Sequence, residues 1–273
     1  MQLQIALESD KVLVSHGPDI NFDLLKTRTF SQHGSEVAMK RFRSGLDDTD
    51  TRKHRASLFN HLVEQWQSLK HPNIYPVHGI YGADSPELSI IMPFSQEGNI
   101  LKYLSTQPSA DKFRLVQDFA MGLAYIHSRC IAHGNVRPEN VLIYRGRACI
   151  TDICISASLQ LAVLQESNRV TIPDGWAYKP LEELTAVDAG GTLAPTQARD
   201  VFPFAHSVYH IYTGRPFWDP KRLTARLLSQ PGAENMSQYP RPDDIPAHVW
   251  SVLQRCWSQN ITMDKVVRKL QDS

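Results

Sequence analysis

Apolar and polar residues alternate in short runs through the first 94 positions, which is the spacing of half-buried strands. Runs of this kind predict five strands, over residues 11–15, 24–30, 36–42, 74–81 and 88–92. Between the third and fourth runs the spacing becomes helical over residues 57–70, where Leu58, Leu62, Trp66 and Leu69 share one side. His71-Pro72-Asn73 then ends that helix. This part of the chain therefore predicts a sheet with one helix.

The pattern from about residue 95 onward is mainly helical. One long apolar stripe runs from Leu115 to Ile126, and shorter stripes recur over residues 249–257 and 266–270. Residues 141–144 and 148–151 predict a hairpin around Gly146. Residues 153–200 contain scattered Gly, Pro and Thr, which predicts irregular structure.

Composition and charge limit the function classes. Lys and Arg (29) nearly balance Asp and Glu (28), so neither nucleic acid nor an anionic membrane is an expected partner. The sequence has no apolar run long enough to span a bilayer and no signal peptide, so no membrane association is expected. Four cysteines without C-x-x-C spacing predict a reduced, intracellular and cytoplasmic protein. The basic run at residues 52–55 follows three aspartates and predicts a solvated loop.

Three motifs carry chemistry. His-Gly-Asn-Val-Arg-Pro-Glu-Asn occupies residues 133–140, Val-Ala-Met-Lys occupies residues 37–40, and Asp-Ile-Cys occupies residues 152–154. They resemble the catalytic loop, the third strand and the metal-binding motif of eukaryotic protein kinases. Roughly residues 11–271 resemble such a domain, most closely in its tyrosine-kinase-like branch.

The resemblance implies an α+β, two-lobed protein-kinase fold in a single domain over residues 1–273. A small N-lobe (about residues 1–94) would hold a five-stranded antiparallel sheet and one helix. A hinge would follow at about residues 92–97, and a larger, mainly helical C-lobe would span about residues 95–273. Asp200 would cap the backbone of the catalytic loop from inside the C-lobe.

The resemblance also implies a site for ATP and Mg²⁺. Lys40 would hold the phosphates of ATP, and Asn140 and Asp152 would bind the metal, which prefers oxygen ligands. The other nucleotide contacts would be Ala38, Met92, Phe94 and Leu142. Taken alone, Val-Ala-Met-Lys could equally end in a strand lysine that points to water, but together with the motif at residues 133–140 it favours the kinase role. For Asn140 the alternative of a loop-capping residue stays open. The apolar core would include two groups, Leu25 with Ala38 and Leu142, and Trp66 with Val77, His133 and Ile153.

Several positions depart from the kinase pattern where phosphate and protons are handled. Asn135 stands where the catalytic base would be an aspartate, and an amide cannot take a proton at neutral pH. Leu62 stands where a helix glutamate would pair with Lys40, and Glu64, two residues on, should face elsewhere because two residues turn a helix by about 200°. No glycine lies between positions 18 and 33, where a glycine-rich loop would close over phosphates.

Other departures affect regulation and structure. Gly134 replaces the arginine that would bind an activation-loop phosphate, so switching by that phosphate is not expected. Cys154 replaces a glycine, either as an inert small side chain or as a reactive thiol. Near residues 176–182 the Ala-Pro-Glu motif is altered, and the partner arginine expected after Trp257 is missing as well.

These observations lead to three hypotheses. The first is a pseudokinase that acts as a binding or scaffolding module for other proteins, with weak or no binding of ATP and Mg²⁺. The alternative is an active, unconventional ATP-dependent protein kinase that modifies Ser/Thr or Tyr. The third is a decayed copy with little function of its own, which poor stability would reveal.

Overall fold

The computed structural model describes residues 11–16, 22–28, 35–42, 49–82, 88–155, 178–180, 194–217, 239–258 and 261–272. Contacts divide the chain into two compact units. The N-terminal unit comprises Met1–Lys70 and Tyr75–Gln96, and the C-terminal unit comprises His71–Ile74 and Glu97–Ser273.

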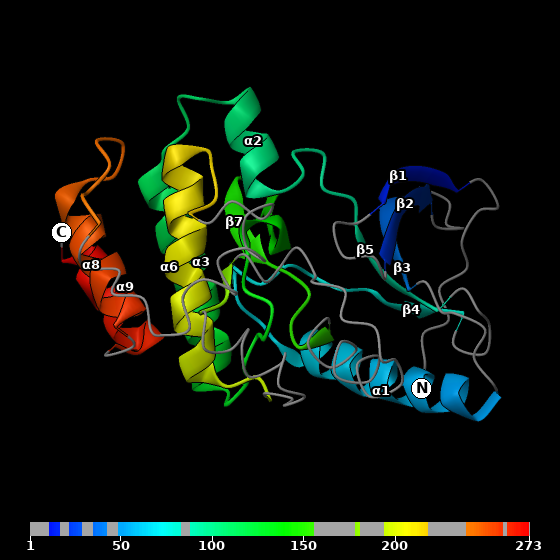
Figure 1. Ribbon diagram of the computed structural model, residues 1–273. Coiled ribbons are helices and arrows are strands. Elements are labelled where there is room, and N and C mark those ends of the chain that lie inside the picture. Colours follow the sequence, from blue (N-terminus) through cyan, green and yellow to red (C-terminus); the bar gives the residue numbers. More distant parts are fainter. Residues whose placement is uncertain are drawn as a thin grey trace, which may run out of the picture. The chain divides into compact units, whose positions relative to one another are not determined.

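The N-terminal unit contains the predicted five-stranded antiparallel sheet (Figure 1), with the strand order β1-β2-β3-β5-β4. Its strands are β1 (Val12–His16), β2 (Phe22–Arg28), β3 (Glu36–Phe42), β4 (Gly79–Tyr81) and β5 (Ser89–Pro93). One face of the sheet forms a core of Leu25, Val37, Met39 and Ile91, against which Tyr81 packs. The strands therefore follow the alternation seen in the sequence.

The helix that the structure describes in this unit is longer than predicted. Helix α1 spans Thr49–Ser68 and packs against β4. The basic run at residues 52–55 therefore lies in a helix and not in the expected solvated loop, because Lys and Arg are good helix formers even without an apolar stripe.

The predicted strand over residues 74–81 is reduced to Gly79–Tyr81. Pro76 has no N–H to give to a ladder, and the Tyr75 carbonyl instead accepts the Trp66 indole N–H at 2.8 Å. Ile74 makes an isolated bridge to Ile150, within the C-terminal unit.

The C-terminal unit is mainly helical, as predicted. Its helices are α2 (Ile100–Thr106), α3 (Lys112–Ser128), α6 (Gln197–Thr213), α8 (Ala247–Trp257) and α9 (Met263–Gln271). The predicted hairpin consists of β6 (Val141–Tyr144) and β7 (Arg147–Ile150), and a short 3-10 helix, η1, covers Pro138–Asn140. Helix α6 begins within the range predicted to be irregular, because Thr196 caps it and accepts from Arg199 N. Most of that range, residues 156–177 and 181–193, lies outside the described residues.

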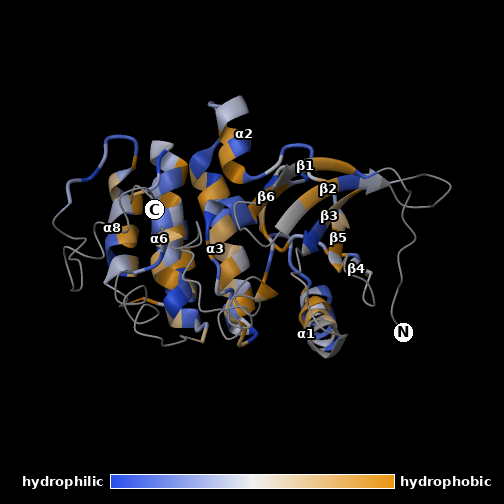
Figure 2. Ribbon diagram, turned by 45° about the vertical axis from the view of Figure 1, so that its right-hand side comes forward, coloured by the Kyte–Doolittle hydropathy of each residue, from blue (hydrophilic) through white to orange (hydrophobic). Residues whose placement is uncertain are grey.

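Helix α3 is the centre of this unit, since it packs against α6, α9 and β7 (Figure 1). Figure 2 shows hydrophobic and hydrophilic residues interleaved along α3 and α6, as in helices that bury one stripe. Gly122 lets the chain come close: a Cβ there would lie 2.6 Å from the Asn73 carbonyl oxygen. The segment His71–Ile74 is thereby fixed to α3 and β7, with the Asn73 amide donating to Ala148 O at 3.1 Å.

No helix among the described residues is both long and apolar enough to cross a bilayer.

Candidate functional site

The predicted nucleotide-binding residues of the N-terminal unit lie on one face of the sheet. Ala38 on β3 is directly opposite Met92 on β5, and Lys40 is opposite Ile90. Since paired residues share a face and neighbours alternate, these residues face away from the core that contains Met39. Ala38 and Met92 are buried and Lys40 is partly buried. The structure thus brings Ala38, Lys40 and Met92 together, as the resemblance implies.

Strand β2 also contributes a residue to that face, and this residue is a lysine. Lys26 of β2 is opposite Ala38, whereas Leu25, predicted to group with Ala38, is opposite Met39 in the core. That predicted grouping is wrong because the register of β2 puts Leu25 on the other side of the sheet. The Lys26 ammonium lies 2.6 Å from Glu36 and 4.6 Å from the centre of the Phe94 ring. The Lys26 side chain, held by an ion pair and a cation–π contact, therefore lies beside Ala38 and Phe94.

At position 62 of helix α1, where the kinase pattern has a glutamate that pairs with the strand lysine, this chain has a leucine. Leu62 is buried, with 7% of its surface exposed, as is Trp66 about one turn further along the helix. Glu64 is exposed. Both observations agree with the sequence-based interpretation of this helix as a core element.

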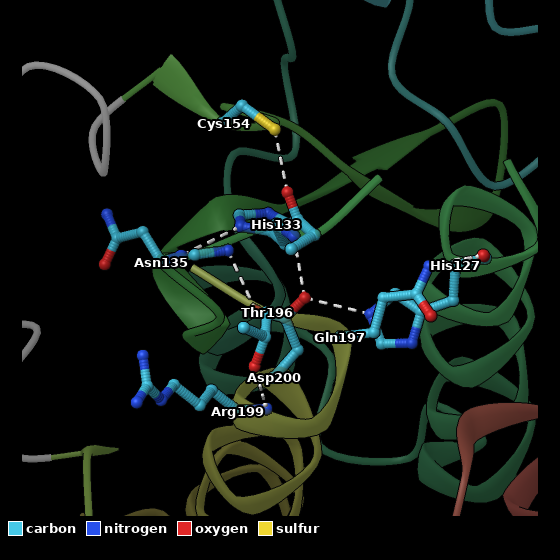
Figure 3. Close-up of polar contacts among 10 residues, drawn as sticks. His127, His133, Asn135, Cys154, Thr196, Gln197, Arg199 and Asp200 are labelled. Carbon is cyan, nitrogen blue, oxygen red and sulfur yellow. Dashed lines mark hydrogen bonds and ion pairs between the residues drawn. The ribbon is translucent and has the colours of Figure 1, made fainter. Parts of the chain in front are cut away.

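The loop at residues 133–140 is held by the Asp200 carboxylate at the start of α6 (Figure 3). Asp200 accepts the backbone N–H groups of His133 at 2.7 Å and Gly134 at 2.8 Å, and the Nε2–H of His127 at 2.9 Å. Only 2% of Asp200 is exposed, so its charge is stabilised by these three donors and not by water. The predicted role of Asp200 as a cap of the loop backbone is confirmed.

Hydrogen bonds fix the tautomer of His133. Its Nδ1 accepts the Asn135 N–H at 3.2 Å, so the ring proton lies on Nε2, which donates to Thr151 O at 3.0 Å. Burial lowers the pKa of His133 more than the nearby Asp200 and Asp152 raise it. His133 is therefore a neutral, structural side chain, in agreement with its predicted packing role.

Asn135 occupies the position of the missing base. Its backbone carbonyl accepts the Asn140 side-chain amide at 2.9 Å, and its own side chain is directed away from Asp200 (Figure 3). Asn135 is 5% exposed, and its buried Nδ2 has no hydrogen-bond partner among the residues that the structure describes. An amide in this place has no basic atom with which to remove a proton.

Asn140 fills one of the two roles left open by its sequence, that of holding the loop. Its amide nitrogen holds the loop through Asn135 O, and its backbone carbonyl accepts from Thr151 N at 3.0 Å. The amide oxygen is the atom that remains for a cation. Asp152 is 1% exposed and follows Thr151 directly. Amide and carboxylate oxygens fit Mg²⁺, so this pair could hold the metal of a nucleotide complex.

Cys154 adopts a conformation that glycine prefers. Its φ is +62°, and that of Asp152 is +66°. The backbone at position 154 thus adopts the left-handed conformation even with a cysteine, although a residue with a Cβ is strained there. Burial, reinforced by the Asp200 and Asp152 charges, raises the pKa of the Cys154 thiol to about 11. Thiolate is scarce at neutral pH, which favours the inert alternative over the reactive one.

A second network engages the loop from the end of the activation segment. The Arg137 guanidinium is 2% exposed, bonds to Glu139 at 2.9 Å and lies 5.9 Å from the centre of the Tyr178 ring. The Tyr178 hydroxyl in turn contacts His210 Nδ1 at 2.8 Å. Burial lowers the pKa of His210 despite the nearby Glu139. The Tyr178 hydroxyl donates to Glu139 Oε1 at 3.4 Å, so the Arg137–Glu139 pair belongs to the same network.

The predicted site residues fall in both units, each described by itself. Lys40, Ala38, Met92 and Phe94 belong to the N-terminal unit, and Asn135, Asn140, Asp152 and Leu142 to the C-terminal unit. Leu142 is half-buried on β6, opposite Cys149. Of the glycine-free stretch at residues 18–33, residues 22–28 form β2, and the remainder lies outside the described residues. Trp176 and Glu182 of the altered Ala-Pro-Glu region lie outside them as well.

Three residues that contribute to the site were not predicted from the sequence: Lys26, Tyr178 and His127. Lys26 was missed because its effect depends on a strand register. Tyr178 was missed because only the fold brings it to Arg137, residues that are far apart in the chain. His127 was missed although it ends the predicted helix just before the loop, where a polar residue facing the loop could have been suspected.

Comparison with known proteins agrees with this architecture. The family model "Protein tyrosine and serine/threonine kinase" matches residues 23–272. The human Receptor-interacting serine/threonine-protein kinase 1 is 22% identical over 70% of this chain and 30% of its own length. The human Ankyrin repeat and protein kinase domain-containing protein 1 is 23% identical over 74% of this chain and 27% of its own.

A third relative has a name of another kind. The human Retinal guanylyl cyclase 2 is 27% identical over 83% of this chain and 20% of its own length. The chain thus spans less than a third of each of these curated relatives. Since the family model covers nearly the whole chain, this protein belongs to the protein tyrosine and serine/threonine kinase family.

Proposed function

We propose that this domain is a pseudokinase that binds other proteins through a stable kinase scaffold and transfers phosphate slowly or not at all. The observation that carries the proposal is Asn135. It occupies the place of the catalytic base in a loop that Asp200 otherwise holds in order. Loss of a general base lowers a rate by about 10²–10⁴-fold.

Two further features weaken phosphate handling. Leu62 is buried where a carboxylate would orient Lys40, and Glu64 is exposed. Position 62, from which the kinase glutamate would reach the strand lysine, is thus occupied by an apolar side chain. Since positioning and electrostatics carry most of phosphoryl transfer, this loss adds to that of the base.

Weak nucleotide binding is part of the proposal. Lys26 and its ion pair lie beside Ala38, where an apolar residue would suit the flat base of a nucleotide. If ATP and Mg²⁺ bind, Lys40 would contact phosphate, and Asn140 and Asp152 would hold the metal. The metal would supply positive charge against the phosphates.

An active, unconventional kinase is the second candidate. The retention of Asn140 and Asp152, two oxygen donors linked through Thr151, favours it. Of the three relatives described above, two carry kinase names and one the name of a guanylyl cyclase. Similarity to these relatives therefore does not decide between an active kinase and a pseudokinase, and the decision depends on Asn135, Asn140 and Asp152.

We place the protein inside the cell. All four cysteines are free, as expected in a reducing compartment. Three of them lie in the C-terminal core or beside the loop, and burial raises the pKa of Cys149 to about 12.

Two measurements on purified protein test the proposal. The first is transfer of radiolabelled phosphate from ATP with Mg²⁺ to the protein itself and to a generic substrate. We expect the wild type to equal Lys40→Met, and Asn135→Asp to remain inactive because the helix carboxylate is still missing. Magnesium-dependent transfer by the wild type that Lys40→Met abolishes would establish the kinase instead.

The second measurement is a thermal-shift titration with ATP, with and without Mg²⁺. A small or metal-independent shift agrees with the pseudokinase, whereas a shift of several degrees that needs Mg²⁺ contradicts weak binding. Circular dichroism of each variant serves as the folding control. A wild type that unfolds at or below growth temperature would favour the decayed copy.

A further inference from the structure

Polar contacts converge on Glu36, the first residue of β3, and join it to β2 and to the segment after β5. The Lys26 ammonium lies 2.6 Å from Glu36 Oε1, and the Gln96 amide donates to Glu36 Oε2 at 2.6 Å. The Phe94 N–H donates to the backbone carbonyl of Glu36 at 3.2 Å. Both carboxylate oxygens of Glu36 are therefore engaged, one by a charge and one by an amide. All four residues belong to the N-terminal unit.

These contacts determine where the Lys26 side chain lies. Its Cα is opposite Ala38 in the register of β2 and β3, and Glu36 is two residues before Ala38 on the same face. Its ammonium lies beside Glu36 and 4.6 Å from the centre of the Phe94 ring. The flexible stem between these two ends therefore runs from Ala38 toward Phe94. Both residues are among the predicted nucleotide contacts, and we call the part of the sheet between them the base strip.

The neighbours of Lys26 along the base strip are apolar. Ala38 is buried, and so is Met92, which is opposite it on β5. Small and apolar side chains in such a row fit the flat face of an aromatic ring. The Lys26 side chain is 32% exposed, so of these three residues it is the one that can turn away into water.

The contacts that hold Lys26 make it an obstacle to such a ring. A ring that enters the base strip has to displace the ammonium from both the Glu36 carboxylate and the Phe94 ring. An ion pair at this exposure contributes little by itself, because water and salt screen it. Gln96 restrains the same carboxylate, so the lysine leaves ordered partners when it moves. The base strip should therefore bind a ring weakly with Lys26 in place and more tightly without it.

We propose that Lys26, positioned by Glu36, covers a latent purine site on this sheet and decides whether the site accepts a nucleoside. The inference rests on the weak nucleotide binding of the proposed function and assigns that weakness to one residue. It also separates two causes, because Leu62 and Asn135 affect the phosphates and the transferred proton, whereas Lys26 affects the base. Adenosine, which has no phosphate and needs no metal, reports on the second cause alone.

The test is a titration of the whole chain with adenosine, followed by the ¹³C signals of the methionine methyl groups. The Met92 signal reports on the base strip, and the Met39 signal reports on the opposite face of the sheet. Each signal is assigned through replacement of that methionine by leucine. In Lys26→Val, adenosine should produce a saturable shift of Met92 and bind about tenfold more tightly than to the wild type. Met39 should not shift.

Three further variants separate the roles of charge and position. Lys26→Arg keeps a cation that can pair with Glu36, so it should bind adenosine no better than the wild type. Lys11→Val is the matched control, because Lys11 also lies over an aromatic ring, 5.0 Å from the centre of Tyr81, and the affinity should stay unchanged. Glu36→Gln should raise the affinity by a smaller factor, about two- to threefold, since it removes one partner of Lys26.

Equal affinity of the wild type and Lys26→Val would overturn the proposal, and so would an equal gain in Lys11→Val. An unchanged affinity in Glu36→Gln would overturn the positioning role of Glu36. Lys26→Ala repeats the comparison if the valine variant does not fold. These outcomes are independent of phosphate transfer: a wild type that transfers phosphate would overturn the pseudokinase, whereas the adenosine comparison would still decide the role of Lys26.

Discussion

The loop at residues 133–140 has two sides that differ in how completely their polar groups are satisfied. On the inner side, the Asp200 carboxylate accepts three hydrogen bonds, and both nitrogens of His133 are bonded. On the outer side, Asn135 has a buried amide nitrogen with no partner. The inner side holds the loop in shape, and the outer side is where the chemistry of a kinase would take place.

The comparison teaches that holding a loop and using it for catalysis are separable. The contacts that position the loop come from α3, from α6 and from Thr151, which directly follows β7, and none of them requires an acid at position 135. A protein can thus lose its base and keep a rigid frame for binding partners. This separation predicts very different responses to substitutions on the two sides.

The largest effect is expected for Asp200→Ala. The change leaves the His133 and Gly134 amides buried without an acceptor and removes the bond to His127, so we expect a loss of about 3–5 kcal/mol in unfolding free energy. Asp200→Asn keeps one acceptor oxygen and should lose about half as much. Urea denaturation measures both.

Asp243→Ala is the control for Asp200, since that carboxylate is exposed, and a change below about 0.5 kcal/mol is expected. A loss at Asp200 as small as that at Asp243 would mean that the loop does not depend on its inner contacts.

The second effect is a dependence of stability on pH. Burial lowers the pKa of His133 below 6.5, so between the two pKa values the unfolded chain binds a proton that the folded chain does not. Unfolding free energy should therefore fall as the pH drops from 7 toward 5. Burial also lowers the pKa of His71, His78 and His210, so they add to this slope with the same sign.

The variant His133→Asn should make this slope shallower, because it removes one group that takes up a proton only on unfolding. The control His61→Asn, at an exposed position of α1, should leave the slope as it is. A slope that is the same in all three proteins would show that His133 takes up its proton equally in the folded state.

Much of this frame could be predicted because it depends on local patterns. The alternation over Glu36–Phe42 and the stripe of α3 fix their elements directly, and the motif at residues 133–140 points to Asp200 as its cap. Leu62 and Glu64 were also assigned to the correct sides of α1, since helical rotation is regular.

What could not be predicted depends on register and on long-range contacts. The grouping of Leu25 with Ala38 failed because a shift of one residue between β2 and β3 exchanges the two faces of a strand. The contact of Tyr178 with Arg137 and the bond of Gln96 to Glu36 involve segments far apart in the sequence. Periodicity within one element contains no information about them.

A smaller effect is expected where cysteines adopt positive φ. Cys130 has φ +59° and is exposed, so Cys130→Gly should relieve strain and stabilise the protein by about 0.5 kcal/mol. Cys154→Gly relieves the same strain but removes a half-buried thiol that contacts Ala132 O at 2.7 Å, so no net gain is expected. Thermal unfolding of both variants measures the difference. A gain at Cys154 equal to that at Cys130 would show that its side chain adds nothing to the packing under the loop.

The smallest effect is expected on the outer side, for Asn135→Leu. Leucine has a shape close to that of asparagine and removes a buried N–H that has no partner, so the change should be neutral or stabilise by up to about 1 kcal/mol. The backbone carbonyl that holds Asn140 remains in place. Asn135→Asp is the matched polar change, and it should destabilise because it places a charge at a position that is 5% exposed. If Asn135→Leu instead costs as much as Asp200→Asn, the amide has a structural task, and the two sides of the loop are not separable in the way that their hydrogen bonds indicate.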